Sequence, residues 1–208
     1  MVVQGIVISL LISVGKTSLL QRFVCKKFSP QLKTTVGADF HTRNVEVGDK
    51  SAAVQVIFYL IQIWDTAGQE RYQSLCFNFY KGSECCFIVY DVTSAESFEA
   101  LPKWHSEFLK RINTEKGKFP FVVLANKHDL KEKRVISKEQ GQRWANSVGA
   151  EFFETSAKDM TGVEEAFTKA VNMVFNYSTR TVEVKSNKEK ESTKLHNIPE
   201  RSKDGCPC

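Results

Sequence analysis

The 208-residue sequence lacks the patterns that mark metal-binding, membrane-spanning and nucleic-acid-binding proteins. Its six cysteines include no CxxC pair and its four histidines are scattered, so zinc-ligand spacing is absent and a reducing compartment is the simpler interpretation. The net charge of +5 is too small to indicate a nucleic-acid partner. The first apolar run, Ile6 to Val14, is too short to span a bilayer and has no basic leader, so we expect a buried strand rather than a signal peptide.

Apolar runs and helical patterns alternate along the chain as far as Tyr177. Strand-like runs occupy Gly5–Ile12, Val54–Trp64, Cys85–Tyr90, Phe119–Leu124 and Glu151–Glu154. Helical patterns occupy Lys16–Cys25, Ser94–Asn113, Ser137–Ser147 and Gly162–Tyr177. This alternation predicts an α/β fold with a mostly parallel sheet and helices on both faces. The alternating residues of Phe40–Val47, followed by the turn residues Gly48-Asp49-Lys50, add one antiparallel hairpin.

The hydrophobic periodicity ends near Ser178, where Ser, Lys, Glu, Thr and Asn begin to dominate. No apolar face can be drawn beyond this point, so the segment cannot bury enough surface to form a core. We therefore predict a globular domain over residues 1–177 and a flexible tail over residues 178–208, which ends in Cys206-Pro207-Cys208.

A candidate phosphate-binding segment, Gly15-Lys16-Thr17, lies between the first predicted strand and the first predicted helix. Backbone N–H groups at a helix start can hold phosphate, Lys16 can neutralise it, and Thr17 can bind Mg²⁺. The full phosphate-loop pattern requires a glycine five residues before Gly15, where this chain has Leu10. Alone, the tripeptide is equally compatible with an ordinary helix start.

The segment Asp65-Thr66-Ala67-Gly68-Gln69 follows the predicted strand that ends at Trp64. An aspartate at the carboxyl end of such a strand can hold Mg²⁺ through water, and Gly68 can present its N–H to a terminal phosphate. Gln69 can orient an attacking water molecule. A plain turn at a strand end is a weak alternative for a pattern of five fixed residues.

Two further segments, Asn126-Lys127-His128-Asp129 and Thr155-Ser156-Ala157-Lys158, follow predicted strands. The Asp129 carboxylate can accept hydrogen bonds from the N1 and N2 donors of guanine, which adenine lacks. The N–H of Ala157 can donate to guanine O6, where adenine carries an amine. Such polar pairs reject the wrong base by roughly 10⁴–10⁵ because a mismatch leaves buried groups unpaired. All these motifs lie at carboxyl ends of strands, where open α/β sheets bind ligands.

Together these residues resemble the small GTPases, and within them the Rab family. The segments that resemble Rabs are Val36-Gly37-Ala38-Asp39-Phe40, Trp64-Asp65-Thr66-Ala67-Gly68-Gln69-Glu70, Tyr80-Lys81-Gly82 and Tyr90-Asp91-Val92-Thr93. The segments most similar to the branch of late endosomes and vacuoles are Glu70-Arg71-Tyr72-Gln73-Ser74-Leu75, Ser83-Glu84-Cys85-Cys86 and Phe119-Pro120-Phe121-Val122-Val123-Leu124. The resemblance implies the P-loop NTPase fold of small GTPases, with a six-stranded, mostly parallel sheet and about five helices.

The resemblance also implies a GTP/GDP switch and assigns its residues. The implied nucleotide contacts are Ser13, Val14, Gly15, Lys16, Thr17, Ser18, Phe28, Thr35, Gly68, Asn126, Lys127, Asp129, Ser156, Ala157 and Lys158. The implied Mg²⁺ ligands are Thr17, Thr35 and Asp65, and Gln69 is the implied catalytic residue. Thr35 would join the ion only when a γ-phosphate is present, which would order the flanking loops. Phe40, Trp64 and Phe79 would form an effector patch, for which core packing is the alternative.

The resemblance extends to partners and to the membrane. A Rab would work with an exchange factor, a GTPase-activating protein, a GDP dissociation inhibitor or escort protein, and effectors, around a monomeric core. Cys206 and Cys208 are similar to a double geranylgeranylation site, and stable anchoring does require a second signal beside one lipid chain. A disulfide or a chance pair is the alternative. The implied location is the cytoplasmic face of endosomal or vacuolar membranes, with cycling through the cytosol.

The chain departs from the Rab pattern in its phosphate loop, where two glycines are replaced by Leu10 and Ser13. A residue with a Cβ costs about 1–2 kcal/mol wherever a left-handed backbone is required. Ile12 occupies the position that faces the γ-phosphate in the family, so hydrolysis is the activity most affected. The alternative to a switch is therefore a non-hydrolysing or nucleotide-free membrane-anchored scaffold. A P-loop ATPase ranks third because Asp129 disfavours adenine.

The second departure is the strand before Trp64, which is about seven residues longer than the family pattern. Val54-Gln55-Val56 is echoed by Ile61-Gln62-Ile63, which offers two competing strand registers. The extra residues could extend the hairpin, bulge over the effector surface or promote aggregation. A gene model with a wrong first exon and a retained short intron would explain both departures, and sequencing the transcript tests this hypothesis.

Overall fold

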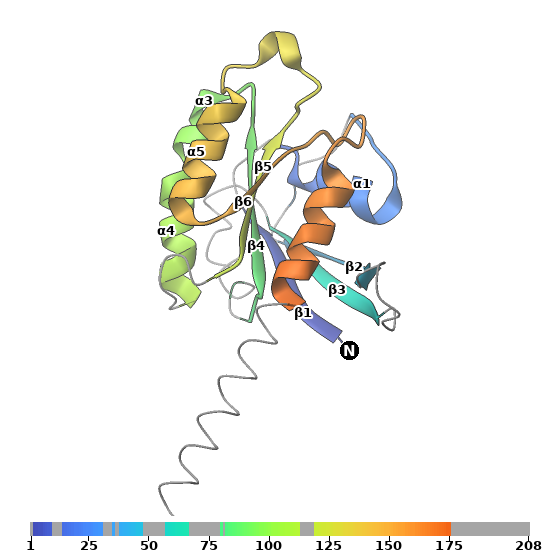
Figure 1. Ribbon diagram of the computed structural model, residues 1–208. Coiled ribbons are helices and arrows are strands. Elements are labelled where there is room, and N and C mark those ends of the chain that lie inside the picture. The colour runs from blue at the N-terminus through green and yellow to red at the C-terminus, as the bar shows by residue number, and fades with distance from the viewer. Residues whose placement is uncertain are drawn as a thin grey trace, which may run out of the picture. The chain divides into compact units, whose positions relative to one another are not determined.

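The computed structural model describes residues 2–9, 14–30, 35, 38–47, 57–66, 80, 82–112 and 119–175 (Figure 1). The strands are β1 (Val2–Ser9), β2 (Ala38–Val47), β3 (Ile57–Thr66), β4 (Cys85–Asp91), β5 (Phe121–Asn126) and β6 (Glu151–Glu154). The helices are α1 (Lys16–Cys25), α3 (Ala95–Glu99), α4 (Leu101–Ile112), α5 (Lys138–Val148), the short 3₁₀ helix η2 (Lys131–Lys133) and a helix at residues 163–175. The chain divides into two units, Met1–Val174 and Phe175–Cys208, and only Phe175 of the second unit is described.

The strands form one six-stranded sheet in the order β2-β3-β1-β4-β5-β6. Only β2 runs antiparallel to its neighbour β3, and the other pairs are parallel. The predicted α/β fold with a mostly parallel sheet is confirmed. The order also places β1 inside the sheet, between β3 and β4.

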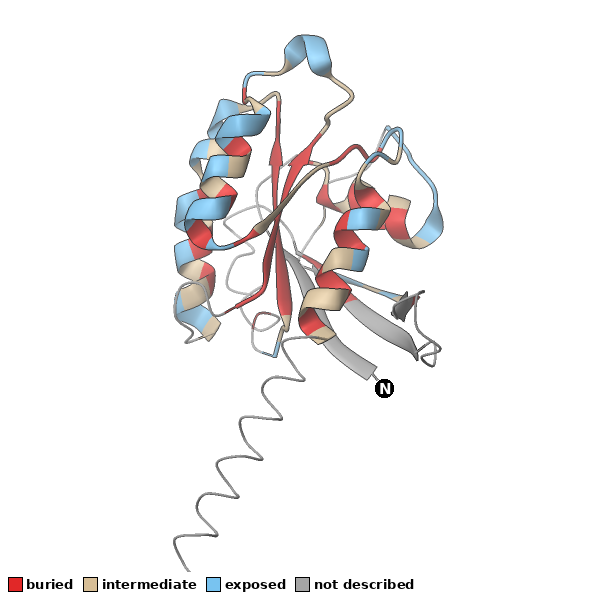
Figure 2. Cartoon of the chain, in the orientation of Figure 1, coloured by how far each residue is buried: buried red, intermediate tan, exposed pale blue. Residues whose placement is uncertain are grey.

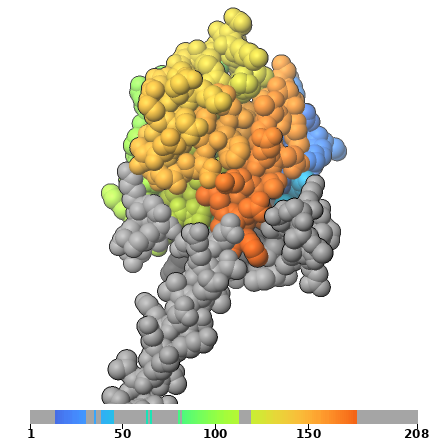
Figure 3. Space-filling view, viewed as in Figure 1, coloured from blue at the N-terminus to red at the C-terminus, as the bar shows by residue number. Residues whose placement is uncertain are grey.

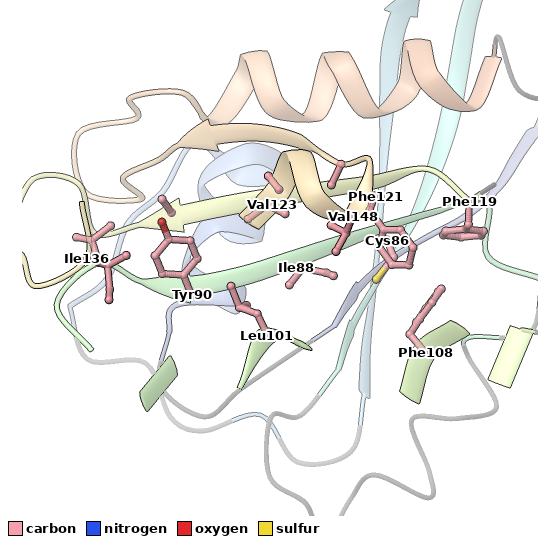
Figure 4. Close-up of a cluster of buried hydrophobic side chains, with 14 of the residues drawn as sticks. Cys86, Ile88, Tyr90, Leu101, Phe108, Phe119, Phe121, Val123, Ile136 and Val148 are labelled. Carbon is pink, nitrogen blue, oxygen red and sulfur yellow. The ribbon is translucent and has the colours of Figure 1, made fainter. Parts of the chain in front are cut away.

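Helices cover both faces of the sheet, as the alternating side chains of its central strands require (Figure 1). On one face, Cys86, Ile88 and Tyr90 of β4 join an apolar cluster with α4 and α5 (Figure 4). On the other face, the Phe87 ring lies 4.6 Å from the Phe167 ring in the helix at residues 163–175. Strands β4 and β5 are therefore buried along their whole length, and the exposed residues of the helices lie on their outer surfaces (Figure 2).

The segments after β5 supply most of the described surface on the side shown in the space-filling view (Figure 3). Helix α5 begins as its sequence predicts, because Ser137 accepts a hydrogen bond from the Gln140 N–H and the Gln140 side chain accepts one from the Ser137 N–H.

No helix among the residues described above is long and apolar enough to cross a membrane.

Two predicted elements differ in the structure. The predicted helix Ser94–Asn113 is wrong as a single helix, since α3 ends at Glu99 and α4 begins at Leu101. Pro102 explains the break, because it has no N–H with which to continue the helical hydrogen-bond ladder from α3. The predicted strand Gly5–Ile12 begins earlier, at Val2, because Val2 and Val3 already pair with β3, and its predicted end at residues 10–12 lies outside the described residues. An apolar run alone does not mark where pairing starts.

The β2–β3 hairpin incorporates part of the extra sequence before Trp64. The antiparallel ladder runs without interruption from the Val47↔Ile57 pair to the Ala38↔Thr66 pair. Of the three arrangements considered for the extra residues, the described part shows the extended hairpin. The predicted start at Val54 and the turn Gly48-Asp49-Lys50 lie outside the described residues.

Gly141 of α5 provides a test of the packing against β4 and β6. A methyl group at this position would lie 2.3 Å from the Tyr90 hydroxyl oxygen and 2.7 Å from Cε2 of Phe152. We predict that Gly141→Ala lowers the free energy of unfolding by about 1–3 kcal/mol, although alanine favours helix formation. Urea denaturation measures the change. The control Arg143→Ala, at an exposed position of the same helix, should change stability by less than about 0.5 kcal/mol, and equal effects of both variants would contradict this packing.

Candidate functional site

Polar residues gather at the ends of the parallel strands. Asp65 lies near the end of β3, Asp91 ends β4, Asn126 ends β5, and Thr155 follows β6. Because the carboxyl ends of parallel strands meet at one edge of the sheet, these residues share that edge with the start of α1. This is the place at which the sequence predicts a ligand site.

The start of α1 is held against the end of β5 by a side-chain hydrogen bond. The amide Nδ2 of Asn126 donates to the Val14 carbonyl oxygen at 2.7 Å, and both residues are buried. Gly15 caps the helix with φ +87° and ψ 28°, a left-handed geometry that favours glycine. A Cβ on Gly15 would lie 2.7 Å from the same Asn126 nitrogen. Both the backbone geometry and the close approach therefore require glycine here.

Oxygen atoms of three predicted metal ligands converge beside the α1 start. The Thr17 hydroxyl donates to Asp65 Oδ2 at 2.5 Å, and the Thr35 hydroxyl oxygen lies 2.8 Å from that of Thr17. Asp65 is fully buried, and its Oδ1 has no hydrogen-bond partner among the described residues. Burial raises the pKa of Asp65, whereas the Thr17 hydrogen bond and the Lys16 charge act to lower it. Hydroxyl and carboxylate oxygens with one buried acceptor to spare fit a hard cation such as Mg²⁺.

The two predicted base-reading segments lie side by side. The Ser156 hydroxyl donates to Asp129 Oδ1 at 2.8 Å, and the His128 N–H donates to the Thr155 carbonyl at 3.1 Å. A third bond joins the Thr155 N–H to the Ala125 carbonyl at 2.9 Å. The Asp129 carboxylate is thus held in place by the segment that carries Ala157.

Lys127 has a partner that the sequence analysis did not assign. Its Nζ lies 2.5 Å from Asp91 Oδ2, and Asp91 Oδ1 accepts hydrogen bonds from the N–H and the hydroxyl of Thr93. Asp91 is buried and Lys127 has φ 63°, so the ion pair holds an unusual backbone turn. The signal available in the sequence was the spacing of Asp91 and Thr93, which favours an Asx turn at the end of a strand.

Arg22 of α1 also reaches this edge. Its Nη2 donates to the Lys158 carbonyl at 2.9 Å, and its Nη1 donates to the Lys26 carbonyl at 2.9 Å. The first bond joins α1 to the segment that follows β6. No pattern in the sequence pairs these two positions, which are 136 residues apart.

The remaining predicted residues divide into those that the structure places and those it does not. Ser18 lies in the first turn of α1, Phe28 lies beyond the end of α1 with 38% of its surface exposed, and Ala157 is buried. Lys158 Nζ lies 4.0 Å from Asp129 Oδ2. The residues that lie outside the described parts of the chain are Ser13, Gly68, Gln69, Phe79, Cys206 and Cys208.

Two residues of the predicted effector patch occupy paired positions in the sheet. Phe40 of β2 is directly opposite Trp64 of β3 in the antiparallel ladder. Phe40 is 44% exposed, so core packing does not account for its position.

Gly15 and Gly82 together test the close approach of α1 to Asn126. Both have positive φ, +87° and +92°, but a Cβ on Gly82 would meet nothing within 4 Å. We predict that Gly82→Ala costs about 1–2 kcal/mol from backbone strain alone, and that Gly15→Ala costs about 1–3 kcal/mol more because of its collision with Asn126. Chemical denaturation measures the free energy of unfolding of both variants. Equal decreases would contradict the prediction, because they would show that the Asn126 side chain moves aside without loss of stability.

Comparisons with known proteins identify the family to which this site belongs. The family model named Ras, described as the Ras family, matches residues 7–176. The Ras-related protein Rab-7a of Dictyostelium discoideum is 49% identical over 156 residues, covering 74% of this chain and 73% of that protein. The Ypt/Rab-type GTPase avaA of Emericella nidulans is 43% identical over 198 residues, covering 94% and 91%. The Ypt/Rab-type GTPase Rab7 of Neurospora crassa is 44% identical over 199 residues, with the same coverage of 94% and 91%. The chain therefore belongs to the Ras family, and within that family to the Rab7-type small GTPases.

Proposed function

We propose that this protein is a guanine-nucleotide switch that hydrolyses GTP and controls vesicle traffic at endosomal or vacuolar membranes. The observation that carries the proposal is the Asp129 carboxylate, which Ser156 holds at the sheet edge beside the buried Ala157. Membership of the Rab7-type GTPases supports the same function. Neither these relatives nor the described residues favour the scaffold or ATPase alternatives.

The base-binding part of the site would select guanine through hydrogen-bonding groups that guanine can pair and adenine cannot. Ser156 occupies only one position on Asp129 Oδ1, so the carboxylate retains acceptors for the N1 and N2 donors of the base. The Ala157 N–H would donate to O6, and Phe28 would lie across the edge of the ring. Adenine would leave these groups unpaired, which makes it a poor ligand.

The phosphate-binding part uses the start of α1. The N–H groups after Val14 and the Lys16 ammonium would bind phosphate oxygens, together with Ser13 and Ser18. The Asn126 bond to Val14 fixes this segment relative to Asp129, which is three residues further along the chain. This buried hydrogen bond is thus one of the contacts that set the distance between the base site and the phosphate site.

Thr17, Thr35 and Asp65 would hold the Mg²⁺ ion that accompanies the nucleotide. When bound, the ion would neutralise charge on the phosphate oxygens and on the buried Asp65. Thr35 precedes β2, the strand that carries Phe40, so the position of Thr35 would bear on the effector surface that Phe40, Trp64 and Phe79 would form. Through this connection the bound nucleotide would change effector affinity.

The catalytic and membrane roles rest on the family resemblance. Gln69 would orient the attacking water, and Gly68 would contact the terminal phosphate. Geranylgeranyl groups on Cys206 and Cys208 would anchor residues 178–208 as a tether for the switch formed by residues 1–177. The partners would be an exchange factor, a GTPase-activating protein, a GDP dissociation inhibitor or escort protein, and effectors, at the cytoplasmic face of the membrane.

Replacing Asp129 tests base recognition directly. We predict that Asp129→Asn weakens GDP binding by roughly 10²-fold or more and favours xanthosine diphosphate, because the new amide can donate to the xanthine carbonyl at C2. Competition against a fluorescent nucleotide measures both affinities. The control Asp159→Asn alters a nearby aspartate that binds the Thr161 N–H and should leave base preference unchanged. An unchanged preference in Asp129→Asn would contradict the assigned role.

Removing the metal tests the oxygen cluster. We predict that EDTA accelerates GDP release from the wild type by about tenfold or more, and that Asp65→Asn releases GDP quickly with little further response to EDTA. Stopped-flow fluorescence measures the release rates, with Glu99→Gln on α3 as an exposed control. If Asp65→Asn responds to EDTA as strongly as the wild type, Asp65 is not a ligand.

A further inference from the structure

Three polar side chains form a cluster directly behind the two base-reading segments. Arg134 Nη2 lies 2.7 Å from Glu154 Oε1 and 2.9 Å from His128 Nδ1. His128 Nδ1 is also 3.6 Å from Glu154 Oε2. None of these three residues belongs to the nucleotide contacts proposed above. We refer to them as the 128–134–154 cluster.

The contact between Arg134 and His128 has a defined hydrogen-bond direction. Arginine carries donors only, so in this contact the Arg134 Nη2 donates and the His128 Nδ1 accepts. The Arg134 and Glu154 side chains are only 21% and 16% exposed, which limits screening of their ion pair by water. The cluster therefore pairs two partly buried opposite charges beside the His128 ring.

Arg134 is itself anchored to the core. Its Nη1 donates to the Ile136 carbonyl at 3.2 Å, and the Val135 and Ile136 N–H groups donate to the Val92 carbonyl beyond β4. Tyr90 belongs to the apolar cluster and lies at the same end of it as Ile136 (Figure 4). Burial raises the pKa of Tyr90, the nearby Glu154 raises it further, and Arg134 lowers it, so the phenol stays neutral beside the ion pair.

Two residues of the cluster are adjacent in sequence to base-reading residues. His128 lies immediately before Asp129, and Glu154 lies immediately before Thr155. The backbone bond from the His128 N–H to the Thr155 carbonyl joins the same two positions at 3.1 Å. A displacement of either side chain would therefore shift Asp129 relative to Ala157.

We infer that Arg134 and Glu154 are positioning residues that determine guanine specificity, acting through His128 on the placement of Asp129. The inference rests on the proposed function, because it concerns the same base site. The ion pair ties Arg134 to Glu154, the residue before Thr155, and the contact between Arg134 and His128 connects the same guanidinium to the residue before Asp129. Loss of the pair would loosen the contacts to guanine N1 and N2 before it affected the phosphate contacts.

The test compares GDP with inosine diphosphate, whose base lacks the N2 amine. We expect Glu154→Gln and Arg134→Lys to lower the ratio of GDP affinity to inosine diphosphate affinity by at least about threefold in the full-length protein. The matched control is Glu151→Gln on the same strand, which removes an ion pair to Lys169 of 3.0 Å and should leave the ratio unchanged. Competition titrations give both affinities, and thermal unfolding reports stability separately.

A second pair of variants separates positioning from general stability. His128→Gln retains an acceptor for Arg134 and should preserve most of the ratio, whereas His128→Ala should lower it. An unchanged ratio in Glu154→Gln, Arg134→Lys and His128→Ala, with stability alone reduced, would overturn the inference while leaving the proposed function intact. A wild-type protein that does not bind GDP would overturn both.

Discussion

The buried hydrogen bond from Asn126 to the Val14 carbonyl is the constraint on which the rest of the site depends. It joins residues that are 112 positions apart and closes at 2.7 Å. Val14 lies just before the start of α1, where phosphate would bind, and Asn126 lies three residues before Asp129. Because Gly15 has no Cβ, the two segments can approach each other this closely. A nucleotide has a fixed length between base and phosphates, so a rigid link between the two segments pre-organises the site.

The sheet concentrates polar groups where the core ends. Strands β4 and β5 are buried along their whole length, and the buried polar residues Asp65, Asp91 and Asn126 lie at or near the carboxyl ends of β3, β4 and β5. These buried groups require partners, and Lys127 and Thr17 supply some of them. Asp65 Oδ1 has none among the described residues, so the fold leaves an acceptor available for a ligand. Folding and binding are thus linked through the same buried carboxylate.

The sequence was sufficient to predict the features that depend on local patterns. The helix Lys16–Cys25 and the strand Glu151–Glu154 have the predicted bounds, and the helix predicted from Ser137 starts with that residue as its cap, since periodicity and caps are encoded within a few residues. The break before Leu101 was missed because α4 continues the apolar pattern across Pro102. The Lys127–Asp91 and Arg134–Glu154 pairs could not be predicted, because they join separate segments whose spacing only the sheet order defines.

The most direct measurement of the central claim is the affinity of the wild-type protein for GDP compared with ADP, in the presence of Mg²⁺. A site built around Asp129 and Ala157 predicts that GDP binds at least about 10⁴-fold more tightly, because adenine leaves buried polar groups unpaired. Equal affinities for the two nucleotides, or no detectable GDP binding, would contradict the assignment of this edge of the sheet as a guanine-nucleotide site.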